Sequence, residues 1–166
     1  MSAKTKKILN IVVDVVVAVV LAFALFLAIC TISSKAKGYD QYTAVFGKAY
    51  IGVRSDSMKG EGSDNFSKGD LIAIKLLDAK DTSDLKEGDI ITFEDVGIVE
   101  GKRLLNTHRI KEVVKNDDGS VKHFITHGDN NPEGSDETVG IGEVVGIYTG
   151  KAGGIGHVLL FMNSSA

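Results

Sequence analysis

The chain has 166 residues, a length that suits one domain with accessory segments. Its net charge is −3 and no basic stripe runs through the polar part, so nothing in the composition indicates a nucleic-acid-binding protein. The single cysteine, Cys30, excludes an intramolecular disulfide, and four histidines with one cysteine argue against a structural zinc site. The 19 glycines suit frequent turns between short strands.

The first predicted element is a membrane-spanning helix. Three lysines lie among the first seven residues, and the apolar run that follows covers residues 8–32. Residues 15–32 carry no charge, and at a helical rise they extend roughly 27 Å, close to the hydrocarbon thickness of a bilayer. We therefore expect a cytoplasmic tail at 1–7 and an uncleaved anchor at 8–32. A cleavable signal peptide is the alternative, but its apolar region would be shorter.

The lysines also predict the orientation of this anchor. Three precede the apolar run, whereas Lys35 and Lys37 follow it. This bias places the N-terminus inside and residues 38 onward outside the cell membrane, or in the lumen of the endoplasmic reticulum if the source is eukaryotic. Cys30 then lies within the bilayer, which argues against a catalytic thiol.

The remainder of the chain is predicted to be mainly β. Residues 33–47 are polar and small and indicate a juxtamembrane linker, and residues 48–151 form the expected β domain. The predicted strands cover approximately 48–55, 70–77, 89–94, 104–114, 121–127 and 139–149. Asn116-Asp117-Asp118-Gly119 is typical of a hairpin turn. No long amphipathic helix is predicted after residue 33, so we expect a compact, curled set of sheets.

The C-terminal tail, residues 152–166, becomes apolar again at 158–162. This stretch is too short to span a bilayer. A last strand, an interfacial segment and the start of a second membrane segment all remain compatible with it.

The first candidate site is the pair of serines that follows the apolar run at 49–53. In extended backbone, residues i and i+2 point to the same side, so Ser55 and Ser57 are expected to face one cleft. One hydroxyl then serves as a nucleophile and the other as a donor to an oxyanion. The alternative is structural, because two serines at a strand end commonly bond to their own backbone.

A base and an acid for such a nucleophile are present further along the chain. His108 lies in a strand-like run, and its ordinary pKa of roughly 6.5 suits a general base. Asp129 and Asp136 follow it and provide carboxylates to orient the imidazole. The structural alternatives are a half-buried strand histidine, a turn aspartate and a loop carboxylate. These residue types alone occur by chance in a chain of this length.

Several short motifs, taken together in order and spacing, carry a family resemblance. They are Ser55-Asp56-Ser57-Met58, Lys68-Gly69-Asp70-Leu71-Ile72, Gly88-Asp89-Ile90-Ile91-Thr92-Phe93, Thr107-His108-Arg109-Ile110, Gly128-Asp129-Asn130-Asn131 and Val144-Val145-Gly146. Over residues 48–150 the chain resembles type I signal peptidases. It is most similar to the endoplasmic-reticulum-type Ser-His-Asp branch, because His108 stands where the common bacterial branch has a lysine.

The resemblance implies a fold, an activity and residue roles. The fold is the β-rich catalytic domain shared with LexA-like self-cleaving repressors, behind an N-terminal transmembrane helix. The activity is a serine endopeptidase that cleaves signal peptides from exported preproteins after small residues. Ser57 matches the nucleophile and His108 the general base. Ser55 matches the hydroxyl that joins the backbone N–H of Ser57 in the oxyanion hole.

The acid of the triad is the last role that the resemblance implies. The family has two acidic positions in its last motif, which Asp129 and Asp136 match. We expect Asp136 to complete the triad and Asp129 to hold the loop or strand in place, although the spacing to Asp136 is one residue longer than the pattern. The chain also has Lys59-Gly60 where the family commonly has Glu-Pro.

The implied partners are signal-peptide-bearing preproteins, the lipid bilayer and the protein-export machinery, with no cofactor, metal or nucleic acid. Two alternatives remain open at this point. One is a non-catalytic, membrane-tethered β-domain that binds partners, for which Ser57 and His108 would be far apart. The other is a dedicated regulatory serine peptidase of the same fold.

Overall fold

A computed structural model describes residues 2–36, 42–45, 47–99 and 102–151. The chain divides into two compact units, Met1–Ala44 and Val45–Ala166. The apolar tail expected at 152–166 and positions 37–41 and 46 of the expected linker lie outside the described residues.

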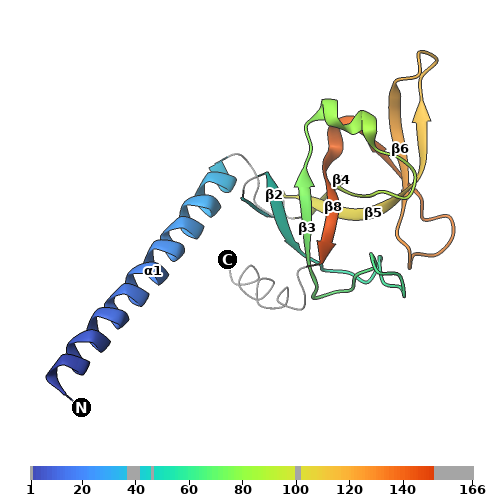
Figure 1. The fold of residues 1–166 in the computed structure, drawn as a ribbon. Coiled ribbons are helices and arrows are strands. Elements are labelled where there is room, and N and C mark those ends of the chain that lie inside the picture. Colours follow the sequence, from blue (N-terminus) through green and yellow to red (C-terminus); the bar gives the residue numbers. More distant parts are fainter. Residues whose placement is uncertain (1, 37–41, 46, 100–101, 152–166) are drawn as a thin grey trace. The chain divides into compact units, whose positions relative to one another are not determined.

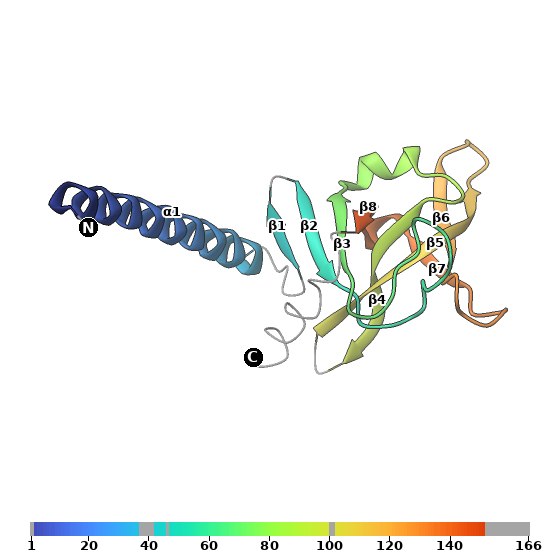
Figure 2. The same cartoon turned by 60° about the horizontal axis from the view of Figure 1, so that its bottom comes forward.

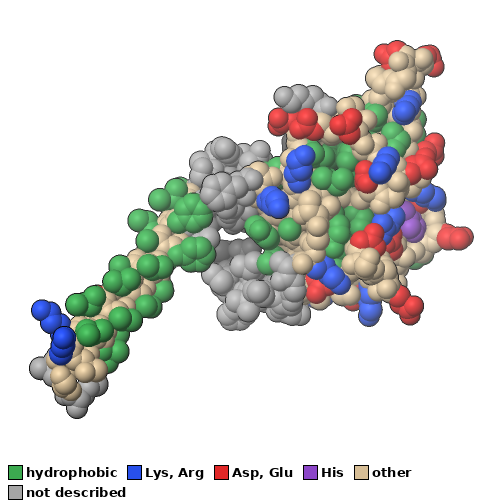
Figure 3. Space-filling view, in the orientation of Figure 1, with side chains coloured by type: hydrophobic (Ala, Val, Ile, Leu, Met, Phe, Trp, Pro, Cys, Tyr) green, Lys and Arg blue, Asp and Glu red, His purple; other side chains and the backbone are tan. Residues whose placement is uncertain are grey.

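The first unit contains one long helix, α1 (Ala3–Ala36). Its segment Lys4–Phe26 has a mean hydropathy of 2.8 and none of it is buried, so the helix is long and apolar enough to span a membrane. Figure 3 shows hydrophobic side chains along its length, with lysines near its N-terminal end. The helix includes most of the tail expected at 1–7 and the first residues of the expected linker. The predicted orientation of this helix, with the N-terminus inside, stays a prediction.

The described second unit is built mainly of strands, as the sequence predicts. After β1 (Thr43–Val45), which lies where the two units divide, the strands are β2 (Lys48–Gly52), β3 (Leu71–Leu76), β4 (Ile90–Val99), β5 (Lys102–Lys115), β6 (Val121–His127), β7 (Glu137–Gly140) and β8 (Val144–Lys151). Two short 3-10 helices, η1 (Ala79–Asp84) and η2 (Ile141–Glu143), complete the elements. The strand predicted at 139–149 is two strands, because η2 interrupts it.

These strands form one curled antiparallel sheet rather than the expected set of sheets. From β2 onward the order is β2-β3-β8-β4-β5-β6-β7, so the last strand lies between β3 and β4 (Figures 1 and 2). Register shifts interrupt most of the pairings, including β4 with β5 after Asp95 and β5 with β6 after Ile110. Such bulges bend a strand and increase its twist, which explains how one sheet curls without breaking.

The predicted hairpin between β5 and β6 is confirmed. Asn116 N–H donates to Ser120 O at 2.8 Å, and Gly119 N–H donates to Asn116 O at 2.9 Å. Gly119 has φ +82°, a left-handed conformation that glycine adopts without steric cost. This turn sets the register between β5, which carries His108, and β6.

One face of the sheet carries the main core, and we call it the His108 face. Cross-strand partners share a face, so Ile91 and His108 lie on the same side, as do Ile110 and Thr126. The core cluster consists of Leu85, Ile91, Phe93, Ile110, Phe124, Val139 and Val144. A buried histidine is therefore part of the same surface that stabilises the domain.

The central position of β8 requires a glycine. A Cβ on Gly146 would lie 2.5 Å from the backbone oxygen of Lys75 on β3. We expect Gly146→Ala to separate β3 from β8 and to lower the free energy of unfolding by about 1–3 kcal/mol. Guanidinium-induced unfolding of the full chain in detergent micelles measures this change.

The matched control is Gly142→Ala. A Cβ at Gly142 would meet no atom within 4 Å, so its unfolding free energy is expected to change by no more than about 0.5 kcal/mol. Equal effects of the two substitutions would contradict the close approach of β3 and β8.

Candidate active site

The two serines lie together in a turn just after β2. Strand-like pairing continues to Val53, which exchanges backbone hydrogen bonds with Gly69 and Asp70. A turn then closes with Lys59 N–H donating to Asp56 O at 3.0 Å. The Oγ atoms of Ser55 and Ser57 are 3.1 Å apart, so the two hydroxyls share one side as the i, i+2 spacing predicts.

The backbone of this turn is fixed by the loop that follows β6. Asn130 N–H donates to Ser57 O at 2.8 Å, and the Asn130 side-chain amide donates to Asp56 O at 3.1 Å. A Cβ on Gly128 would lie only 2.9 Å from Ser57 O, so the loop approaches the serine as closely as a glycine allows. Within the described chain the N–H of Ser57 has no acceptor, which leaves it free to bind an oxyanion.

His108 lies at the centre of β5 and is 3% exposed. Its ring packs edge-on against Phe93, with centroids 6.0 Å apart. Its Nδ1 lies 2.8 Å from Oε2 of Glu137 on β7. A ring nitrogen that donates to a carboxylate fixes the tautomer and leaves Nε2 of the neutral ring as an acceptor. The side chain therefore has the environment of an oriented base.

The loop that contacts the serine turn follows directly on β6, the strand that pairs with β5. Arg109 pairs with His127 across β5 and β6, and the same register continued by one residue places Gly128 opposite His108. Gly128 is the residue that lies against Ser57 O. Among the described residues no hydrogen bond joins Ser57 to His108, and the Ser57 hydroxyl bonds to that of Ser55.

The expectation that Asp136 orients His108 is not met by the geometry. Asp136 Oδ1 lies 2.9 Å from Nδ1 of His127, and its Oδ2 accepts from Lys111 Nζ at 2.7 Å. Asp136 immediately precedes β7, whose first residue, Glu137, pairs with Thr126 on the His108 face. Since successive strand residues point to opposite faces, Asp136 points away from that face.

Glu137 was missed from the sequence, although a signal for it was present. Val139 is the apolar residue of β7 and is 1% exposed on the core side. Two residues earlier on the same strand, Glu137 must face the same side. Anchoring the strand on Val139 and counting back by two would have selected Glu137 over Asp136.

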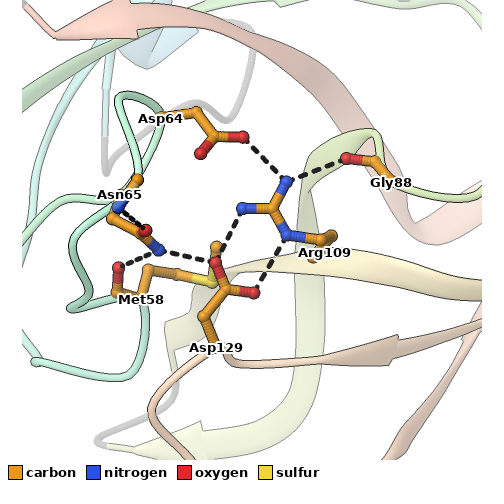
Figure 4. A network of polar contacts seen from close by, with 7 residues as sticks. Met58, Asp64, Asn65, Gly88, Arg109 and Asp129 are labelled. Carbon is orange, nitrogen blue, oxygen red and sulfur yellow. Dashed lines mark hydrogen bonds and ion pairs between the residues drawn. The ribbon is translucent and has the colours of Figure 1, made fainter.

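Asp129 holds segments of the site together. This is the role in holding a loop or strand that we expect of it from the sequence. Its carboxylate accepts from Arg109 Nε at 3.0 Å and from Arg109 Nη2 at 2.7 Å. Oδ2 also accepts from the Asn65 side-chain amide at 2.6 Å, and that amide donates to Met58 O at 3.0 Å (Figure 4). Asp129 thus links β5, beside His108, to the residue that follows Ser57.

Arg109 is the hub of this network, which Figure 4 shows. Beyond Asp129, its Nη1 donates to Asp64 Oδ2 at 2.8 Å and to Gly88 O at 3.0 Å. The hydrogen bonds that the guanidinium donates to Asp129 and then to Asp64 raise its pKa above its ordinary value. The hydrogen bond to Arg109 lowers the pKa of Asp64. Four chain segments are therefore joined at one cation.

The Asn65 amide, which begins the glycosylation-type sequence Asn65-Phe66-Ser67, is engaged inside this network. Its Oδ1 accepts from Gly62 N–H at 2.8 Å, its Nδ2 is shared by Met58 and Asp129, and the residue is 9% exposed. The second such sequence, at 163–165, lies outside the described residues.

Across the part of the chain that the structure describes, no group of three or more His, Cys, Asp or Glu side chains is arranged to hold a metal ion. No family model, no curated protein and no solved structure matches this chain. The arrangement itself offers a serine with a free backbone donor, a second hydroxyl, and a buried histidine bound to a carboxylate.

We expect Arg109→Lys to loosen the site. One ammonium cannot reproduce the fork that bonds two carboxylates and a carbonyl, so the free energy of unfolding should fall by about 1.5–3 kcal/mol. Chemical denaturation of the full chain in micelles measures the loss. The control is Arg54→Lys, because Arg54 is exposed and has no charged partner in the described chain, and it should change stability by less than about 0.5 kcal/mol. A loss no larger than that of the control would show that the network does not hold the segments.

Proposed function

We propose that this protein is a membrane-anchored serine endopeptidase of the signal peptidase type, with Ser57 as nucleophile and His108 as general base. The observation that carries the proposal is the arrangement of the Ser57 turn against Gly128, opposite a buried histidine whose Nδ1 is bound by a carboxylate. A serine hydroxyl needs such a base because it is a weak nucleophile at neutral pH. The motif order shared with type I signal peptidases supports the choice of reaction.

The first chemical step of the proposed reaction is attack by Ser57 on the substrate. Ser57 Oγ attacks the scissile carbonyl while Nε2 of His108 accepts its proton. The Ser57 N–H and the Ser55 hydroxyl donate to the oxyanion that develops, and their 3.1 Å Oγ–Oγ separation lets Ser55 reorient between Ser57 and substrate. The imidazolium forms beside Glu137, whose negative charge stabilises it.

The second step returns the enzyme to its starting state. The imidazolium of His108 protonates the leaving amine, and the C-terminal product departs. Water, deprotonated by the same ring, then hydrolyses the ester on Ser57. Every proton moves through His108, so the reaction needs no metal or nucleotide.

The substrate assignment rests on the anchor and the resemblance together. α1 is long and apolar enough to span a bilayer, and we propose that it keeps the β unit at a membrane surface, where the ends of signal peptides emerge. We propose that the substrate segment binds as an extended strand, with small side chains before the cleaved bond, as the family resemblance implies.

The test is processing of a secreted precursor by the purified full chain in proteoliposomes. We expect Ser57→Ala and His108→Ala to abolish cleavage, because each removes a group that no other residue replaces. Ser55→Ala should lower kcat about 10²–10³-fold, the usual effect of losing one oxyanion donor.

Two substitutions serve as matched controls for this test. Ser63→Ala and His123→Ala change the same residue types outside the site and should leave processing within about twofold of wild type. Cleavage by His108→Ala at the wild-type rate would exclude the proposed mechanism, and absence of cleavage by the wild-type chain would exclude the proposed function.

A further inference from the structure

Two adjacent carboxylates at the start of β7 bind two different histidines. Asp136 Oδ1 lies 2.9 Å from Nδ1 of His127, whereas Glu137 Oε2 lies 2.8 Å from Nδ1 of His108. His127 pairs with Arg109, the neighbour of His108, so the two histidines lie on opposite faces of the sheet. The strand alternation thus produces two separate histidine–carboxylate pairs from four residues.

We propose that Glu137 is the positioning residue of His108, and that Asp136, which matches the family's acid in sequence, has no part in the reaction. This inference rests on the proposed function, since it assigns the orienting group of the same site. Glu137 acts through His108 and touches no reacting atom, so it is a positioning residue rather than a catalytic one.

The length of the glutamate side chain is required by the strand order. Glu137 is on β7 and His108 on β5, and β6 lies between them. Two strand spacings amount to about 10 Å, which a histidine ring and a glutamate span together. An aspartate at 137 is shorter by one C–C bond, about 1.5 Å, and would fall short of Nδ1.

The intervening strand leaves the path open. β6 ends at His127 and is followed by Gly128, which has no side chain, and opposite Glu137 it carries Thr126, a small one. Thr126 Oγ1 is the one buried side-chain polar atom without a partner among the described residues. Thr126 pairs with Glu137 across β6 and β7, so this hydroxyl lies next to the proposed positioning residue.

A further side chain fixes the carboxylate of Glu137. Asn106 lies two residues before His108 on β5, and its Nδ2 is 3.3 Å from Glu137 Oε1 and 3.3 Å from Asp95 Oδ2. Both oxygens of Glu137 are therefore engaged, one by the imidazole and one by the amide. This support resists rotation of the carboxylate away from the ring.

Asp136 has a different set of contacts. Besides His127, it accepts from Lys111 Nζ at 2.7 Å, and both contacts lower the pKa of the carboxyl, with Lys111 the larger cause. These groups lie on the surface that faces away from the core, and they tie β7 to β5 and β6 from outside. Asp136 and Glu137 are thus a matched pair, one residue apart, for comparison.

The kinetic test compares Glu137→Gln with Asp136→Asn in the full chain, in proteoliposomes with a secreted precursor. We expect Glu137→Gln to lower kcat about 10²–10⁴-fold with little change in KM, because a neutral amide cannot stabilise the imidazolium. Asp136→Asn should stay within about threefold of wild type. Glu137→Asp should not restore the rate, whereas a site that needs only a nearby charge would accept it. The reverse pattern, with loss at Asp136→Asn and none at Glu137→Gln, would overturn the assignment.

A spectroscopic test does not depend on activity. In the full chain labelled with ¹⁵N-histidine in micelles, the Nδ1–H signal of His108, assigned by its loss in His108→Gln, should move upfield in Glu137→Gln and stay in place in Asp136→Asn. The Nδ1–H signal of His127 should instead move upfield in Asp136→Asn and stay in place in Glu137→Gln. An unchanged His108 signal in Glu137→Gln would refute the proposal even if the enzyme cleaves its precursor. If these shifts are observed but the wild-type chain cleaves no precursor, the proposed function is refuted and the contact between His108 and Glu137 still stands.

Discussion

Arg109 and its two carboxylates are the interaction on which the candidate site depends. Arg109 follows His108 on β5, and through Asp129 and Asn65 it fixes the carbonyl of Met58, next to Ser57. Asn130 and the close approach of Gly128 add a second attachment of the serine turn to the loop after β6. A partly buried guanidinium satisfied by two carboxylates is geometrically specific, because its planar fork accepts few arrangements. The site is therefore held by charge at its margin and by apolar packing beneath it.

The alternation of side chains along strands separates two roles within a few residues. On the core side, the buried His108 packs against Phe93 and bonds to Glu137, whose side chain is partly exposed. On the other side, Arg109, His127 and Asp136 make partly exposed ion pairs that join loops and strands. One curled sheet thus provides both the proposed chemistry and the network that positions it. A shift of register by one residue would move each set of side chains to the opposite face.

Much of the fold was predictable from local patterns, and the exceptions have physical causes. The apolar helix, most strands and the hairpin at 116–119 follow from composition and turn chemistry. The split of 139–149 into β7 and β8 was missed because apolar residues continue through Ile141, where three residues turn as η2. Ser55 and Ser57 were placed together by their spacing alone. The carboxylate that contacts His108 was not read from the sequence, because it depends on which face β7 presents, a property of long-range pairing with β6.

The most direct test of the central claim is to find the covalent intermediate. The full chain is mixed with a signal-peptide precursor, the reaction is quenched in acid within its first turnover, and the chain is mapped by mass spectrometry. The account predicts that the new carboxyl end of the signal peptide is esterified to Ser57, and that no such adduct forms in His108→Ala. Precursor cleavage without an ester on Ser57, or an ester on Ser55 instead, would contradict it.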